Sequence, residues 1–219
     1  MKRIPYCTLG LAALAVAIHF IPALGGVLQF DRTAVAHGQV WRFFTAHLTH
    51  FGDDHLRWDV LAFVLLGTLA ERISRSGMFS TLGVSALLIT TGVWIAQPQF
   101  AIYRGLSGID SALFGFVLAD LFAEGWQARH GFSIAVGIVA LTGFTAKCAY
   151  ELGTGGAVFV QSNGIFTLVP LAHLLGMVAG AAVAIRRQFV IARLRSADKC
   201  EVPTACKVPS SFRSSVMAK

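Results

Sequence analysis

The sequence predicts an all-α membrane protein, folded as a bundle of six transmembrane helices. Only 13% of its 219 residues are charged and 55% are hydrophobic, whereas a soluble domain carries about 25% charged residues. So few charges could not cover a water-exposed core, so lipid must replace water around much of the surface. Apolar runs of membrane-spanning length also recur along the chain. We therefore expect the lipid bilayer to be its solvent.

Six apolar runs approach the roughly 20 residues that a helix needs to cross a bilayer. The first follows Lys2 and Arg3 and imitates a signal peptide, but Pro22 and two glycines stand where a small-residue cleavage site is required. We interpret it as a retained span. The six expected spans are residues 6–28, 55–72, 78–97, 107–123, 132–150 and 168–186.

The loops between these spans differ in charge, which predicts the orientation. Lys and Arg gather at the N-terminus, at Arg72 and Arg75, at Arg129 and in the C-terminal tail. By the positive-inside rule these regions lie in the cytoplasm, so we expect both termini to be cytoplasmic in a bacterial inner membrane. The loops at 29–54 and 151–167 then lie on the outer side.

The net charge of +7 does not require a nucleic-acid partner. The basic residues stand at the ends of apolar runs and in the tail, as expected of a cytoplasmic anchor. We divide the chain into a membrane domain at 1–187 and a basic cytoplasmic tail at 188–219, which we expect to be disordered because it is polar and rich in serine.

Polar residues inside the spans gather at one depth. His55 and Asp59 open the second span, Ser107 and Asp110 open the fourth, and His173 lies about one turn into the sixth. These three spans all enter the membrane from the outer side. Because polar groups in a bilayer are costly, each is a functional candidate, and their common level predicts one reactive layer.

Ser107 is the candidate nucleophile. It lies in Gly105-Leu106-Ser107-Gly108, where small neighbours allow a tight turn and the close approach of another backbone. A helix N-terminus also supplies free N–H groups that can stabilise an oxyanion. The alternative is that Ser107 only caps its helix, as serines commonly do.

His173 is the candidate general base. Gly176 and Gly180 follow it at intervals of one turn, which gives the helix a face of small residues for close packing. Packing against the fourth span, which carries Ala112 and Gly115, would bring the imidazole to the serine hydroxyl. The alternative is a core histidine bonded to a backbone carbonyl.

Three histidines in nine residues, His47, His50 and His55, raise the possibility of a zinc site. His47 and His50 do not enclose the glutamate of an HExxH motif, whereas His55 and Asp59 share a helix face because they are four residues apart. We expect no metal and no other cofactor.

Together these motifs resemble the rhomboid family of intramembrane serine proteases, which has a six-helix core. The resemblance runs from Gly38 to about Ile185 and rests on Trp41-Arg42, the spacing of His50 and His55, Gly105-Leu106-Ser107-Gly108, and His173 with its two glycines. It implies a catalytic pair of Ser107 and His173 without a third acid. It also implies an oxyanion hole formed by His55 and the Ser107 amide, with Asp59, Gly105 and Leu106 beside the substrate.

Within the family, Tyr103 to Gly108 and the short chain resemble the rhombosortase branch, which implies cleavage of C-terminal sorting helices that bear Gly-Gly. Two positions depart from the pattern. Asp59 stands where many rhomboids have Asn, so it is either protonated or paired with Arg57, Arg42 or a histidine. Ser111 replaces the aromatic or histidine that some members place against the base, and Asp110 is a second acid able to orient a histidine.

The sequence therefore predicts a serine endopeptidase that cuts transmembrane segments of membrane-anchored proteins near the outer face, with residues 153–164 as a lid. Two functions of other classes compete with it. One is an inactive rhomboid-like protein that binds transmembrane helices. The other is a small transporter whose Asp59, Asp110 and His173 relay protons.

Overall fold

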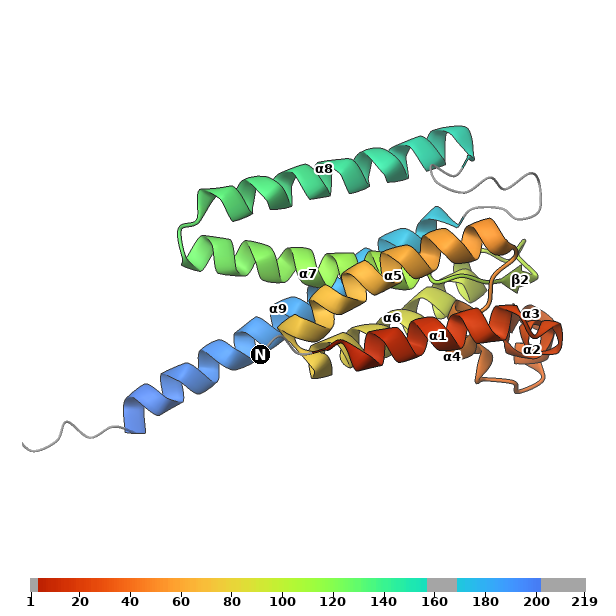
Figure 1. The fold of residues 1–219 in the computed structure, drawn as a ribbon, viewed down its shortest axis with the longest axis horizontal. Coiled ribbons are helices and arrows are strands. Elements are labelled where there is room, and N and C mark those ends of the chain that lie inside the picture. The colour runs from red at the N-terminus through yellow and green to blue at the C-terminus, as the bar shows by residue number, and fades with distance from the viewer. Residues whose placement is uncertain (1–3, 157–168, 202–219) are drawn as a thin grey trace, which may run out of the picture.

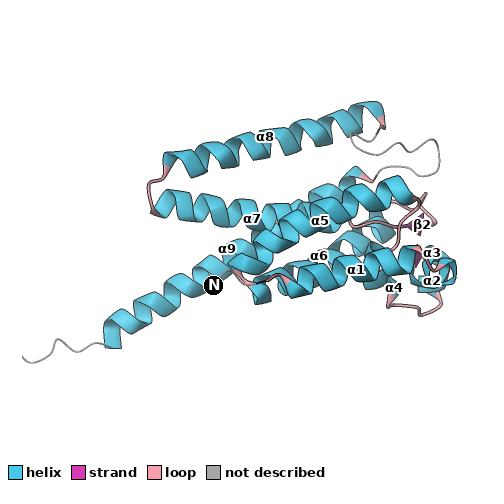
Figure 2. Cartoon of the chain, viewed as in Figure 1, coloured by secondary structure: helices cyan, strands magenta, loops and turns pink. Residues whose placement is uncertain are grey.

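The computed structural model describes residues 4–156 and 169–201, which form a helical bundle with one short β-ribbon (Figures 1 and 2). The long helices are α1 (Tyr6–His19), α5 (Asp53–Ile73), α6 (Arg75–Ala96), α7 (Ser107–Gln127), α8 (Gly131–Thr154) and α9 (Pro170–Glu201). The short elements are α2 (Pro22–Leu28), β1 (Phe30–Asp31), α3 (Arg32–Ala36), α4 (Arg42–Thr45), the 3-10 turn η1 (Ala46–Leu48) and β2 (Ile102–Tyr103).

Within the described residues, three helices are long and apolar enough to cross a membrane by themselves: α6, α8 and residues Pro170–Leu194 of α9. Helices α5 and α7 have 21 residues each, which corresponds to about 30 Å of helix, but they carry more acidic and basic side chains. The protein is thus a multi-pass helical membrane protein. The count of six spans stays a prediction.

The first expected span, residues 6–28, is not one straight helix. Helix α1 ends at His19, and α2 begins at Pro22 after a bend of 109°. Proline favours the first turn of a helix but cannot donate the hydrogen bond that would continue the previous one. The bend turns the chain out of the α1 direction and into the first loop.

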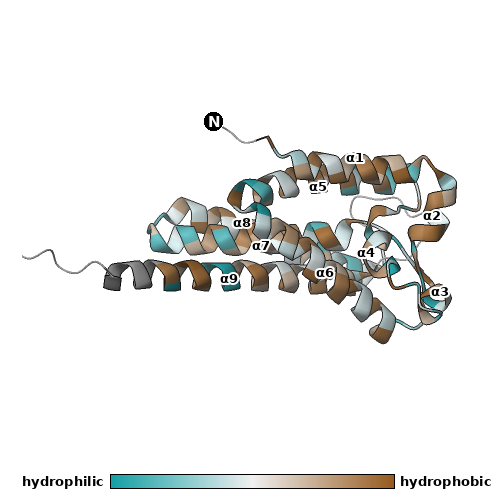
Figure 3. Cartoon of the chain, turned by 90° about the horizontal axis from the view of Figure 1, so that it is seen from below, coloured by the Kyte–Doolittle hydropathy of each residue, from teal (hydrophilic) through white to brown (hydrophobic). Residues whose placement is uncertain are grey.

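Helix α9 lies inside the bundle and packs on both α7 and α6, while α5 packs on α7 and α1 packs on α5 (Figure 1). Helix α8 lies at the periphery beside α7 (Figure 1). Large hydrophobic side chains remain exposed on its surface, among them Phe132 and Val139, and apolar segments recur along α1, α6 and α9 (Figure 3). Such a surface suits lipid.

Glycines set the close contact between α7 and α9. A Cβ atom on Gly176 would overlap the carbonyl oxygen of Gly108, and one on Gly180 would overlap that of Ala112. From the opposite side, a Cβ on Gly115 would overlap the carbonyl oxygen of Met177. The predicted small-residue face therefore meets the predicted partner helix, and this α7–α9 seam has its two backbones in direct contact.

The first loop is braced by buried polar contacts. The Arg42 guanidinium donates to the carbonyl oxygens of Gly26 (2.9 Å) and Gln29 (2.6 Å). Strand β1 pairs antiparallel with β2, with Phe30 opposite Tyr103. These contacts tie the first loop to the segment that precedes α7, where the candidate nucleophile lies.

The last helix is longer than expected. Helix α9 continues to Glu201, past the boundary at residue 187 where the sequence suggested the start of a disordered tail, and its end projects beyond the bundle (Figure 1). Residues 202–219 of that tail and most of the suggested lid, from residue 157 to 164, lie outside the described residues.

Candidate active site

A cavity of about 590 Å³ opens between α5, α7, α8 and α9 near the start of α7. Its lining includes the side chains that the sequence placed in one reactive layer: His55, Asp59, Ser107, Asp110 and His173. The structure thus brings residues from three separate spans to one site. Apolar side chains form much of the remaining wall, among them Leu61, Leu65, Phe114 and Phe144.

Ser107 is the first residue of α7, so the backbone turns sharply just before it. Gly105 has a φ of +119°, which favours glycine, and a Cβ there would lie 2.8 Å from the His55 ring. The next amide, Leu106 N–H, donates to Asp59 Oδ2 at 2.8 Å. Loop geometry therefore fixes where the serine enters the cavity.

Asp59, on α5, contacts this loop and two histidines through one carboxylate oxygen. Its Oδ2 atom lies 3.3 Å from His50 Nε2 and 3.1 Å from His55 Nε2, in addition to the Leu106 amide. Of the pairings considered for Asp59, the histidine pairing is the one observed. The Asp59 carboxylate accepts from the Leu106 amide, so its geometry suits holding the loop more than donating to an oxyanion.

The three clustered histidines, His47, His50 and His55, do not all converge on one point. His47 Nε2 lies 3.2 Å from Thr90 Oγ1 and 3.3 Å from the Ala86 carbonyl oxygen, whereas His50 and His55 face Asp59. Burial lowers the pKa of His47 to about 4 and also lowers the pKa of His50. Near neutral pH the His47 ring is therefore uncharged.

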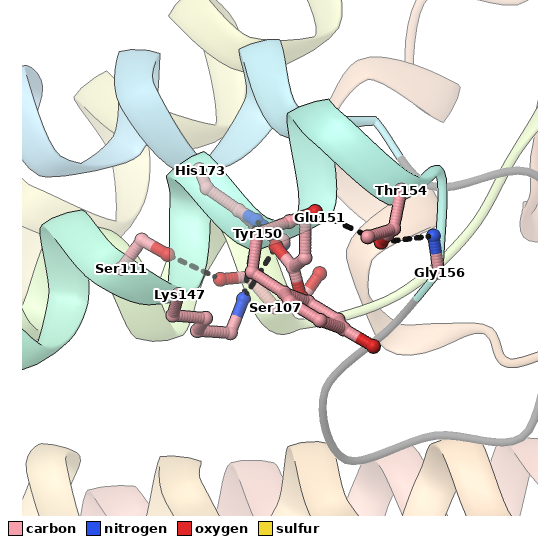
Figure 4. Close-up of polar contacts among 8 residues, drawn as sticks. All are labelled: Ser107, Ser111, Lys147, Tyr150, Glu151, Thr154, Gly156 and His173. Atoms are coloured by element: carbon pink, nitrogen blue, oxygen red, sulfur yellow. Dashed lines mark hydrogen bonds and ion pairs between the residues drawn. The ribbon is translucent and has the colours of Figure 1, made fainter.

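His173 lies one turn into α9, which begins at Pro170, and it is 4% exposed. The α7–α9 seam carries this turn against the start of α7, so His173 and Ser107 face the same cavity (Figure 4). Ser111 donates back to the Ser107 carbonyl oxygen at 2.9 Å. Its hydroxyl therefore bonds within its own helix and makes no contact with His173 among the described residues.

An acid that the sequence reasoning missed lies against the base. Glu151 Oε2, near the end of α8, is 3.2 Å from His173 Nδ1 and 2.8 Å from Lys147 Nζ (Figure 4). The signal was present: Lys147 and Glu151 are four residues apart in an otherwise apolar span, and polar residues in spans are functional candidates. The expected fifth span ends at residue 150, which places Glu151 in the following loop.

Asp110, the acid suggested as a partner for a histidine, has no such contact among the described residues. Its Oδ1 atom is buried without a hydrogen-bond partner in that part of the chain, although it lines the cavity. The carboxylate that meets the candidate base therefore comes from α8.

Comparisons with known proteins identify the fold. Residues 37–187 match the model of the rhomboid domain. The chain is 30% identical to the Bacillus subtilis protein YdcA, which its name places among rhomboid proteases, over 82% of this chain and 87% of YdcA.

Two further relatives are rhomboid proteases by name. GluP of Bacillus subtilis is 29% identical over 68% of this chain and 26% of its own length. GlpG of Haemophilus influenzae is 30% identical over 50% of this chain and 60% of its own. With the domain match over most of the chain and the long alignment to YdcA, the chain belongs to the rhomboid family.

Proposed function

We propose that this protein is an intramembrane serine endopeptidase in which Ser107 is the nucleophile and His173 is the general base. The observation that carries the proposal is that both side chains line one cavity, at the end of a seam where glycines bring α7 and α9 into backbone contact. Family membership supports the same reaction class, because the three relatives carry the name of rhomboid protease.

The reaction follows the logic of serine proteases. Ser107 Oγ attacks the carbonyl carbon of the scissile peptide while His173 Nε2 accepts the hydroxyl proton, and the electron pair of the C=O π bond moves onto oxygen. When this pair returns, the C–N bond breaks and the leaving amine takes the proton from Nε2. Water then hydrolyses the acyl-enzyme with the same base. No cofactor or metal takes part.

The oxyanion is stabilised by N–H groups at the start of α7, which have no intrahelical partners, and by His55 beside them. Gly105 and Leu106 hold the backbone that presents these groups, because the Leu106 amide is tied to Asp59. In this proposal Asp59 acts through the loop and the histidines, and it does not touch the oxyanion.

The substrate is a transmembrane helix of a membrane-anchored protein. The cavity wall carries Leu61 and Leu65 from α5 and Phe144 from α8, so an apolar segment that unwinds there would be met by apolar surface on two sides. The likeness of Tyr103 to Gly108 to rhombosortases supports Gly-Gly sorting helices as the substrate class. In this arrangement six spans cross a bacterial inner membrane, both termini are cytoplasmic, and Ser107 lies near the outer face.

The test is cleavage in proteoliposomes that contain the purified protein and single-span reporter proteins, one of which carries Gly-Gly before its C-terminal helix. We expect cleavage by the wild type and none by Ser107→Ala. If folded wild type binds the reporters but cleaves none of them, the helix-binding function is favoured. If it moves ions across the liposome membrane instead, the transporter is favoured.

A further inference from the structure

We infer that Glu151, balanced by Lys147, is a positioning residue for His173 and sets the pH range in which Ser107 is activated. This inference rests on the proposed function, and it adds Glu151 as a third residue to the pair of Ser107 and His173. The resemblance to the family implied that the base works without an acid, whereas here a buried carboxylate lies 3.2 Å from its Nδ1 atom.

The contact fixes the state of the imidazole. A neutral histidine carries its proton on one nitrogen, and the nitrogen that faces a carboxylate becomes the donor. With Nδ1–H directed to Glu151, the lone pair lies on Nε2, where the serine proton must go. The other tautomer would place a proton on Nε2 and leave the ring unable to act as a base.

Lys147 offsets the negative charge that Glu151 places beside the His173 ring. Its Nζ atom lies 2.8 Å from Glu151 Oε2 and 3.5 Å from His173 Nδ1 (Figure 4). The shorter distance shows that the ammonium pairs with the carboxylate. Lys147 therefore partly neutralises Glu151 and opposes a positive charge on the ring, so the two side chains act on the imidazolium with opposite signs.

The three side chains differ in burial: Glu151 and His173 are enclosed, whereas Lys147 is partly exposed. The side chains of Glu151 and His173 are 2% and 5% exposed, whereas that of Lys147 is 26% exposed. Burying an ionised carboxylate costs free energy unless the carboxylate is paired with a donor or a cation. Among the described residues, the charged or titratable partners of Glu151 are His173 and Lys147, and both line the cavity.

Other charged or titratable groups face the same space. Helix α7 contributes Asp110, α5 contributes His55 and Asp59, and the segment before α7 contributes Tyr103 and Arg104. Asp59 is occupied by two histidines and an amide, and Arg104 donates to Gln29 and to the His50 carbonyl oxygen. Among the described residues, only Lys147 and Glu151 make polar contacts with the His173 ring.

The experiment measures the rate at which a fluorophosphonate probe labels Ser107 in detergent between pH 5 and pH 9. The probe needs the serine and its base but no identified substrate. We compare the wild type with Glu151→Gln, Glu151→Asp and Lys147→Met. Glu124→Gln is the matched control, because Glu124 is an exposed acid near the other end of α7.

We expect Glu151→Gln to lower the plateau rate by roughly 10- to 100-fold, because the imidazolium loses its partner. The acid limb of the pH–rate profile is the fall in labelling rate below the plateau. In Glu151→Gln this limb should move to lower pH by about one unit, and in Lys147→Met it should move to higher pH by a similar amount. Glu151→Asp should keep part of the rate, and Glu124→Gln should match the wild type.

Unchanged acid limbs in both Glu151→Gln and Lys147→Met, with the wild type labelled, would overturn this inference and leave the protease proposal intact. A folded wild type that is never labelled would overturn the protease proposal itself. If Glu151→Gln fails to fold, Lys147→Met decides: an upward shift of its acid limb supports the inference, and no shift overturns it.

Discussion

The α7–α9 seam and helix α8 hold the candidate site in different ways. Eleven of the 21 residues of α7 are buried, but only Gly137, Cys148 and Glu151 are buried among the 24 residues of α8. The nucleophile and the base therefore lie on the tightest interface of the bundle, whereas the acid and one wall of the cavity come from a loosely packed helix. Close packing of the nucleophile and the base is compatible with a loosely packed cavity wall because different helices supply them.

One added methyl group should affect the α7–α9 seam and helix α8 very differently. Gly180→Ala would force its Cβ into the Ala112 carbonyl, so we expect a loss of about 3 kcal/mol in unfolding free energy. Gly143→Ala on α8 meets nothing within 4 Å and should be neutral or slightly stabilising. Thermal unfolding in detergent measures both, and equal effects would contradict the contrast.

The first loop is also closely packed, and the pH dependence of the unfolding free energy tests this through the buried His47. The folded-state pKa of His47 is about 4, against 6.5 for an ordinary histidine, so the unfolded chain binds the proton more tightly between these values. Unfolding free energy should therefore fall by up to about 3 kcal/mol as pH drops from 6.5 to 4. His47→Gln should flatten this dependence, whereas His130→Gln at the exposed turn before α8 should leave it intact.

The loop in front of Ser107 should depend on Asp59 more than on any surface acid. Asp59→Ala leaves the buried Leu106 amide without its acceptor, which should cost about 2 kcal/mol and slow probe labelling by roughly 10- to 100-fold through misplacement of the serine. Asp53→Ala is the control, because it removes an exposed contact with His19. The idea fails if the two variants label at the same rate.

Loosening α8 should have the smallest effect. Phe144 stacks on Phe114 of α7 with ring centroids 5.3 Å apart, and Phe144→Ala should lower unfolding free energy by about 1 kcal/mol. Phe132→Ala, which removes a side chain that is 74% exposed, serves as control. A loss of several kcal/mol from Phe144→Ala would show that α8 is as firmly packed as the seam.

The sequence predicted the seam well because its signals are local. Gly176 and Gly180 repeat at helical spacing after His173, and the start of the sixth helix is one turn before it, at Pro170. The start of α7 at Ser107 was equally readable from the small residues around it. Such patterns specify which face of a helix packs closely, so they locate the residues on that face.

The contact between Glu151 and His173 could not be predicted in the same way. It joins the end of one helix to the start of another across a loop, so it depends on how far α8 extends before the chain turns. The bend at Pro22 was missed for a related reason, because apolar composition continues through it from residue 6 to 28. Hydropathy measures the length of an apolar run and carries no information on its direction.

In the proposed mechanism, His173 activates Ser107. The most direct test is to treat the folded protein with a fluorophosphonate and locate the adduct by mass spectrometry of its peptides. We expect a single adduct on Ser107 in the wild type and loss of that adduct in His173→Ala, whose fold is checked by thermal unfolding. An adduct on another serine, or undiminished labelling of Ser107 in His173→Ala, would contradict it.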